Sequence, residues 1–205
     1  MALPPNAIKA GVTEKLVRDF QHALQDCLEN GETFRTFLKS FDTIVKKHDW
    51  TYQGETEARA ELIYNLNTFA FYDQRRHKQM TESMALELYP FWRYRCGPCI
   101  PPCNHDQWEG ILLPTAHPWW SSHFPANNRY CHCHVEVISI GKMEREKLTV
   151  SPVPGEGLQT ATDPLTGEVI RVPAGVEAGF EDSPAHPGKL KRILLLSLVL
   201  PLPAG

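Results

Sequence analysis

The chain has 205 residues, 42% of them hydrophobic and 22% charged, which is typical of a soluble globular protein. Its net charge of -3 gives no electrostatic reason to expect that it wraps nucleic acid. The longest apolar run, Ile193 to Leu200, is too short for a membrane span, which needs about 20 apolar residues. No signal peptide is recognisable at the N-terminus, so clustered cysteines are expected to be metal ligands or free thiols in a reducing cytosol.

Three amphipathic helices are predicted in the first half of the chain, because apolar residues recur there at spacings of three and four. They cover residues 13–30, about 33–47 and about 56–80. Cys27 belongs to the apolar stripe of the first helix and is expected to pack in the core. Asn65 and Asn67 interrupt the apolar face of the third helix, where an asparagine is mildly unfavourable, so a partner contact for these side chains is expected.

Helical periodicity disappears after Pro90, and the stretch from 89 to 133 is rich in tryptophan, cysteine and proline. Such a segment needs something other than regular secondary structure to hold it. A short strand is predicted around 135–138. Beyond Ser151 the chain is rich in proline and glycine, and a small hairpin is predicted with its turn at 163–167.

These patterns predict an α+β protein made of three consecutive regions. Residues 1–88 form a helical N-terminal half. Residues 89–140 form an irregular Cys/His-rich loop module with short strands, stapled by a metal ion. Residues 141–205 form an extended Pro/Gly-rich C-terminal arm that carries the small hairpin.

The loop module contains ten side chains that zinc accepts as ligands within 39 residues of sequence. They are Cys96, Cys99, Cys103, His105, His117, His123, Cys131, His132, Cys133 and His134. One group lies within 96–105 and a second includes His123 with the two later cysteines. Two groups of ligands separated by a gap are the usual way in which a short loop closes on one metal ion, so a structural zinc site is predicted here.

Strand geometry narrows the choice of ligands in the second group. If the chain is extended there, successive side chains point to opposite faces, so Cys131 and Cys133 share one face while His132 and His134 share the other. The cysteines are favoured as ligands because a thiolate pair gains more from zinc than from solvent.

Three other interpretations of the cluster compete with a structural zinc site. The side chains could be free thiols and ordinary histidines in a packed loop, or cysteines of a disulfide framework, which the missing secretion signal disfavours. A catalytic zinc of the deaminase type needs His-x-Glu before Pro-Cys-x-x-Cys. Here His134-Val135-Glu136 comes after Pro98-Cys99, and the next cysteine, Cys103, is one residue too far away.

Several motifs in this order resemble the phage head morphogenesis family, the relatives of a minor head protein of phage Mu. The motifs are Ile63-Tyr64-Asn65-Leu66-Asn67, Arg76 to Met80, Trp108-Glu109-Gly110, His117-Pro118-Trp119-Trp120, Cys131-His132-Cys133 and Arg171 to Phe180. The resemblance runs from about residue 8 to residue 188. It implies a structural role in the head of a tailed phage, near the portal.

The resemblance also implies which ligands matter most. It carries His105, His123, Cys131 and Cys133 as the shared positions, which would make a tetrahedral set. This chain adds cysteines, and either Cys99 or Cys103 could take the place of a histidine. Cys96 is a further thiol whose part in the site the sequence leaves open.

The expected function is therefore that of a virion protein assembled in the bacterial cytoplasm, without enzymatic activity. Its expected partners are the portal and other head proteins, with passing contact to packaged DNA, and neither a membrane nor a small-molecule substrate. Two alternatives stay open. One is a metal-dependent nuclease or toxin-like effector, which an open metal coordination position would favour. The other is a nucleic-acid-binding adaptor, which salt-dependent DNA binding would favour.

Overall fold

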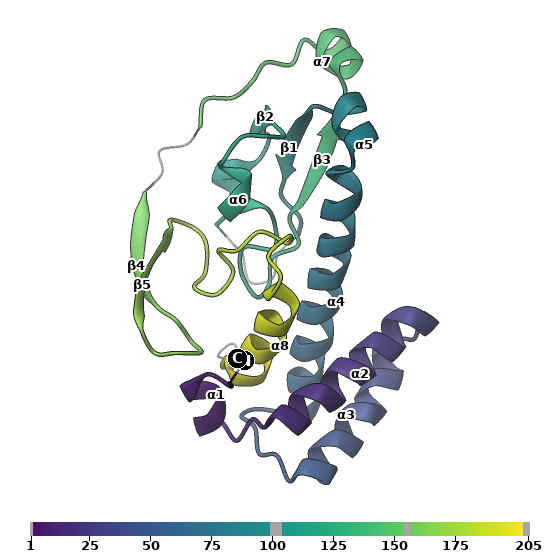
Figure 1. Ribbon diagram of the computed structural model, residues 1–205, viewed down its shortest axis with the longest axis vertical. Coiled ribbons are helices and arrows are strands. Elements are labelled where there is room, and N and C mark those ends of the chain that lie inside the picture. Colours follow the sequence, from purple (N-terminus) through teal and green to yellow (C-terminus); the bar gives the residue numbers. More distant parts are fainter. Residues whose placement is uncertain (1, 99–103, 154–156, 203–205) are drawn as a thin grey trace. The chain divides into compact units, whose positions relative to one another are not determined.

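The computed structural model describes residues 2–98, 104–153 and 157–202. Its helices and strands are shown in Figure 1. In chain order they are α1 (Pro5–Lys9), α2 (Glu14–Asn30), α3 (Phe34–His48), α4 (Thr56–Met80), α5 (Ser83–Leu88), β1 (Phe91–Arg95), the 3-10 turn η1 (Asp106–Trp108), β2 (Leu112–Pro114), α6 (Trp120–His123), β3 (His134–Ile138), α7 (Ile140–Glu146), β4 (Leu158–Thr162), β5 (Val169–Pro173) and α8 (Lys189–Val199). The mixture of helices with small antiparallel sheets confirms the α+β class.

Two compact units share these elements. Unit 1 combines residues 1–71, 162–169 and 190–205, and unit 2 combines residues 72–161 and 170–189. Each unit therefore draws on more than one of the three consecutive regions predicted from the sequence. Among the described helices, none is both long enough and apolar enough to cross a membrane.

The three long helices form where the sequence predicts them. The Thr13 hydroxyl accepts a hydrogen bond from the Leu16 amide and caps α2 at its start, while Gly31 ends the helix in the left-handed conformation. The apolar stripes of α2 and α3 pack together, with the Phe20 ring 5.8 Å from that of Phe41. Cys27 is buried in this core as predicted, and burial raises the pKa of its thiol to about 11.

A charged cluster also joins α2 to α3, and it predicts a pH dependence. Asp19 lies 2.7 Å from Lys47 Nζ and 2.6 Å from His48 Nε2. Hydrogen bonds from Lys47 and then His48 lower the pKa of Asp19 from 3.8 to about 2. Because the folded pKa is the lower one, the stabilisation is complete above the unfolded pKa and is lost as the pH falls toward 2.

Urea unfolding of Asp19→Asn should therefore show a deficit in stability against the wild type at pH 6 that closes as the pH approaches 2. Asp26→Asn, at an exposed position on the same helix, is the control and should show a much smaller deficit. A deficit for Asp19→Asn that is equal at both pH values would contradict the assignment.

Helix α8 is where the structure differs most from the predicted extended arm. Its apolar side chains are buried within unit 1, including Leu194, Leu196 and Leu198. The arm is therefore not confirmed over 189–199, where the chain is helical. A helix that is surrounded by core is apolar on nearly every side and therefore shows no amphipathic period. For this reason the helix could not be predicted from hydrophobic periodicity.

Polar side chains of α4 join α8 to the rest of unit 1. Asn67 donates from Nδ2 to the Ser197 hydroxyl at 3.1 Å, which supplies the partner expected for this asparagine. Arg59, only 2% exposed, donates from Nη1 to the carbonyls of Ser197 and Leu200 at 3.0 and 2.9 Å, and its guanidinium also reaches the Gln53 carbonyl. The arginine thus caps the carbonyl end of α8.

Unit 2 contains a three-stranded antiparallel sheet in the order β2-β1-β3. In the central strand, Trp92 and Tyr94 point to the buried face. Arg93 pairs in register with Glu136 on β3 and forms a salt bridge of 2.7 Å with it. The predicted strand at 135–138 is confirmed as part of β3, and the predicted hairpin is confirmed as β4 and β5.

Candidate metal centre

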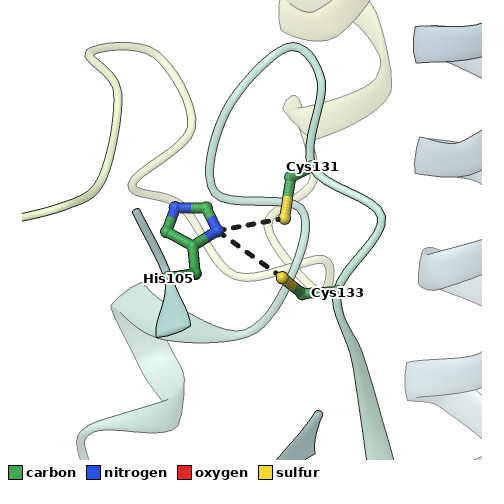
Figure 2. Close-up of side chains that lie close together, drawn as sticks. All are labelled: His105, Cys131 and Cys133. Carbon is green, nitrogen blue, oxygen red and sulfur yellow. Dashed lines mark hydrogen bonds between the residues drawn. The ribbon is translucent and has the colours of Figure 1, made fainter. Parts of the chain in front are cut away.

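Three of the predicted ligands converge in unit 2, as Figure 2 shows. The ligand atoms of His105, Cys131 and Cys133 all lie within 4.8 Å of one another, and all three residues are buried. His105 stands just before η1, and the two cysteines lie just before β3. His105 Nδ1 is 3.5 Å from Cys131 Sγ and 3.6 Å from Cys133 Sγ.

These separations match the spacing of ligands around one tetrahedral zinc ion. With Zn–N bonds of about 2.0–2.1 Å and Zn–S bonds of about 2.3 Å, a nitrogen and a sulfur of one tetrahedron lie about 3.6 Å apart. The two nitrogen–sulfur distances of the site agree with this value. A thiolate pair with an imidazole is also the donor chemistry that zinc prefers. The residues present therefore fit a zinc ion.

The orientation of His105 is fixed by its second ring nitrogen. Nε2 lies 3.0 Å from the carbonyl oxygen of Gly175. Since a carbonyl only accepts, Nε2 carries the proton and donates it, which leaves the lone pair of Nδ1 facing the two sulfurs. A backbone carbonyl in this role is typical of histidines that bind metals. The Trp108 ring stacks on the His105 ring, with the two centroids 4.7 Å apart, and restricts its orientation further.

The alternation of side chains predicted for this segment is confirmed. Cys131 and Cys133 are each 5% exposed, whereas His132 and His134 are exposed to solvent. The His132 ring bonds through Nδ1 with the Pro98 carbonyl at 3.1 Å. The predicted choice of the cysteines over the neighbouring histidines therefore agrees with the direction in which the side chains point.

The two buried sulfurs are hydrogen-bonded to each other. The hydrogen bond between them raises the pKa of Cys131 above its usual range, and burial adds to the increase. The same hydrogen bond from Cys131, with a further one from Tyr94, lowers the pKa of Cys133 below its usual range. A lowered pKa at Cys133 favours the thiolate, which is the form in which cysteine binds metals.

His123 has a different environment from the three converging ligands. Its ring stacks on Trp119 at 4.4 Å, and the Trp108 ring meets it edge-on at 5.0 Å. Nδ1 lies 3.1 Å from the Trp119 carbonyl and 3.0 Å from the Ser122 hydroxyl. The ring nitrogens of His123 do not belong to the group of ligand atoms that lie within 4.8 Å of one another. The role of His123 as a metal ligand therefore remains a prediction from the sequence. The predicted ligands Cys99 and Cys103 lie outside the described residues.

Sequence reasoning missed the residues that support the ligands. Tyr94 hydrogen-bonds with Cys133 and accepts a bond from Asn127 Nδ2 at 3.0 Å. Burial, followed by the charges of the two cysteines, raises the pKa of Tyr94. Glu136, the acid beside the cluster in sequence, pairs instead with Arg93 and Lys142. It therefore has a structural role on the surface of the sheet.

Gly175 supports a prediction about the site, because no other residue fits its position. Its φ is +92°, and an added Cβ would lie 2.8 Å from Cζ2 of Trp108, the ring that stacks on His105. Gly175→Ala should shift either the tryptophan or the carbonyl that orients His105. Loss of such an outer partner typically weakens metal binding about 10- to 100-fold.

Competition with a chromophoric chelator should show this loss of zinc affinity for Gly175→Ala. Gly157→Ala is the matched control, because an added Cβ there would be in ordinary van der Waals contact with the Ala174 Cβ, at 3.6 Å. Equal zinc affinities for the two variants would contradict a role of Gly175 in the site.

Comparison with known proteins confirms the resemblance expected from the sequence. The chain is 30% identical over 120 residues to a protein named as a capsid assembly protein, F, of Escherichia phage Mu, covering 55% of this chain and 26% of that protein. It is 25% identical over 164 residues to the Mu-like prophage FluMu F protein of Haemophilus influenzae, covering 73% of this chain and 39% of that protein. The chain thus spans between a quarter and two-fifths of these relatives. No family model and no solved structure matches it.

Proposed function

We propose that this chain is part of a structural, non-enzymatic protein of a tailed-phage head, and that a zinc ion holds its Cys/His module together. The two Mu-type relatives support the role in head assembly, because one of them is named for capsid assembly. The convergence of His105, Cys131 and Cys133 is the observation that supports the zinc site.

In this proposal zinc acts on architecture. His105, Cys131 and Cys133 would hold the ion, and zinc coordination in small sites supplies folding free energy of about 10 kcal/mol. His105 comes from the loop before η1, and the two cysteines come from the loop before β3. The His105 ring is also hydrogen-bonded to the backbone carbonyl of Gly175 in a third segment. The ion would therefore fix several irregular segments of unit 2 in one arrangement.

We further propose that the protein lies near the portal vertex of the head. It is assembled in the bacterial cytoplasm and stays with the virion, where its partners are the portal and other head proteins. Packaged DNA makes at most passing contacts, since the net charge of -3 offers little attraction to phosphates. This location is supported by the family resemblance of the sequence motifs.

The experiment is complementation of a phage or prophage in which the gene region encoding this chain has been deleted. Infectious particles should be lost on deletion, restored by the wild-type gene and restored poorly by Cys131→Ala. Electron microscopy of the lysates should show whether heads are absent, empty or filled. A normal yield of infectious particles without this region would contradict a role in head assembly.

The portal location has its own measurement. Chemical cross-linking of purified heads, followed by mass spectrometry, should give cross-links between this chain and the portal protein. Heads that contain the chain but give cross-links only to the major capsid protein would contradict the location and leave the role in assembly standing.

A further inference from the structure

We infer that Cys96 is the fourth ligand of this zinc ion, so that the site is a closed Cys3His tetrahedron. The inference rests on the proposed zinc site and goes further, because it decides what kind of site it is. Four protein ligands make a structural site, whereas three ligands and a water make a site that can activate that water for hydrolysis.

The sulfur of Cys96 touches two of the three converging ligands. Cys96 directly follows the last residue of β1, and its Sγ donates to the His105 carbonyl at 3.2 Å. Its side chain also forms a hydrogen bond with Cys133. The sulfur stands outside the group of atoms within 4.8 Å of one another, but one χ1 rotation between staggered positions redirects a cysteine sulfur.

The backbone at Cys96 is held in place by contacts of its own. The Cys96 amide donates to Glu109 Oε2 at 2.5 Å, and the same carboxylate pairs with Arg95 at 3.1 Å. Cys96 is therefore anchored at a fixed distance from the loop that carries His105. A ligand that is held by its backbone and can turn its sulfur loses little entropy when it binds a metal.

Gly97 shows how closely this segment approaches the two other cysteines. A Cβ at Gly97 would lie 2.0 Å from the His132 carbonyl oxygen, so only glycine allows the approach. The Gly97 amide forms a hydrogen bond to the Cys133 sulfur. Amide donors of this kind stabilise the charge that collects on metal-bound thiolates. The chain at 96–97 is thus packed directly against the turn at 131–133.

His123 is the alternative candidate for the fourth ligand, but its contacts indicate a role in positioning Trp108 and Trp119. Its ring lies flat on Trp119 and meets the edge of Trp108, while Nδ1 binds the Trp119 carbonyl. The histidine therefore fixes the two tryptophans, one of which stacks on His105. This role positions a ligand without requiring that His123 bind the ion.

The coordination shell of the wild-type chain provides the first test, because it requires no substitution. X-ray absorption at the zinc edge should fit three sulfurs at about 2.3 Å and one nitrogen at about 2.0–2.1 Å. A shell of two sulfurs and two nitrogens, or one with an oxygen, would overturn the inference while leaving the zinc site intact. A chain that binds no zinc would instead overturn the proposed site.

Substitutions then identify the third thiolate. In cobalt-loaded protein, Cys96→Ser should reduce the near-ultraviolet thiolate-to-cobalt band by about a third, since two of three thiolates remain. Cys99→Ser and Cys103→Ser are matched controls and should leave the band unchanged. If either control loses the band while Cys96→Ser keeps it, Cys96 is not the ligand.

A second variant keeps the test informative if Cys96→Ser fails to fold. Cys96→His replaces the thiolate by another zinc ligand, so it should retain tetrahedral cobalt bands in the visible region and bind about one ion per chain, with the same loss of thiolate intensity. Retention of the full thiolate band in Cys96→His would overturn the inference.

Discussion

Cys131→Ala should destabilise unit 2 by more than about 3 kcal/mol and should remove the effect of zinc on its melting temperature. The reason is that loss of one ligand opens the coordination shell, and coordination contributes about 10 kcal/mol to folding in small sites. Thermal melts with and without a zinc chelator measure both effects.

Cys27→Ala is the matched control for this experiment, because Cys27 is as buried as Cys131, at 3% against 5% exposure. It lies in the core of unit 1, where its thiol acts as a small apolar group. Its loss should cost about 1 kcal/mol and should leave the response to the chelator unchanged. If both variants melt alike and both still respond to the chelator, Cys131 does not bind the metal.

Arg59→Met should produce the second large effect, in unit 1. Methionine fills much of the same volume but donates no hydrogen bond, so three carbonyls lose their buried partner: those of Gln53, Ser197 and Leu200. The Ser197 and Leu200 carbonyls are buried acceptors, whereas the bond to the Gln53 carbonyl is part-buried. Each buried acceptor left unsatisfied costs about 1–3 kcal/mol, so the free energy of unfolding should fall by about 2 kcal/mol or more. Chemical denaturation measures this change.

Arg35→Met on α3 makes the same substitution at an exposed position and should change stability by less than about 0.5 kcal/mol. Hydrogen exchange adds a local readout, because amides at the end of α8 should lose protection in Arg59→Met alone. Unchanged protection of α8 would show that the arginine does not cap this helix.

The elements that could be predicted are those whose residues reveal one buried face. Helices α2, α3 and α4 place apolar residues at helical spacing, so the sequence predicts them nearly to the residue. Strand β1 was missed, although Trp92 and Tyr94 alternate with arginines, because it is short and lies in a stretch dominated by proline, cysteine and tryptophan. Helix α8 was missed because it is surrounded by core and shows no period.

Some features of the candidate site could likewise be predicted from the sequence, and others could not. Strand alternation predicted that Cys131 and Cys133 point together, since that depends on local geometry alone. The placement of His105 beside them was implied by the family resemblance. The contacts from Tyr94 and Gly175 depend on how distant loops meet, and a single sequence carries no signal for them except the glycine itself.

The most direct test of the account is the metal content of the folded wild-type chain, purified without added metal and measured by elemental analysis. About one zinc ion per chain is expected, and it should fall to near zero in a Cys131→Ala, Cys133→Ala double variant. A wild-type chain that is fully folded, with a cooperative thermal transition, and contains no zinc would contradict the account.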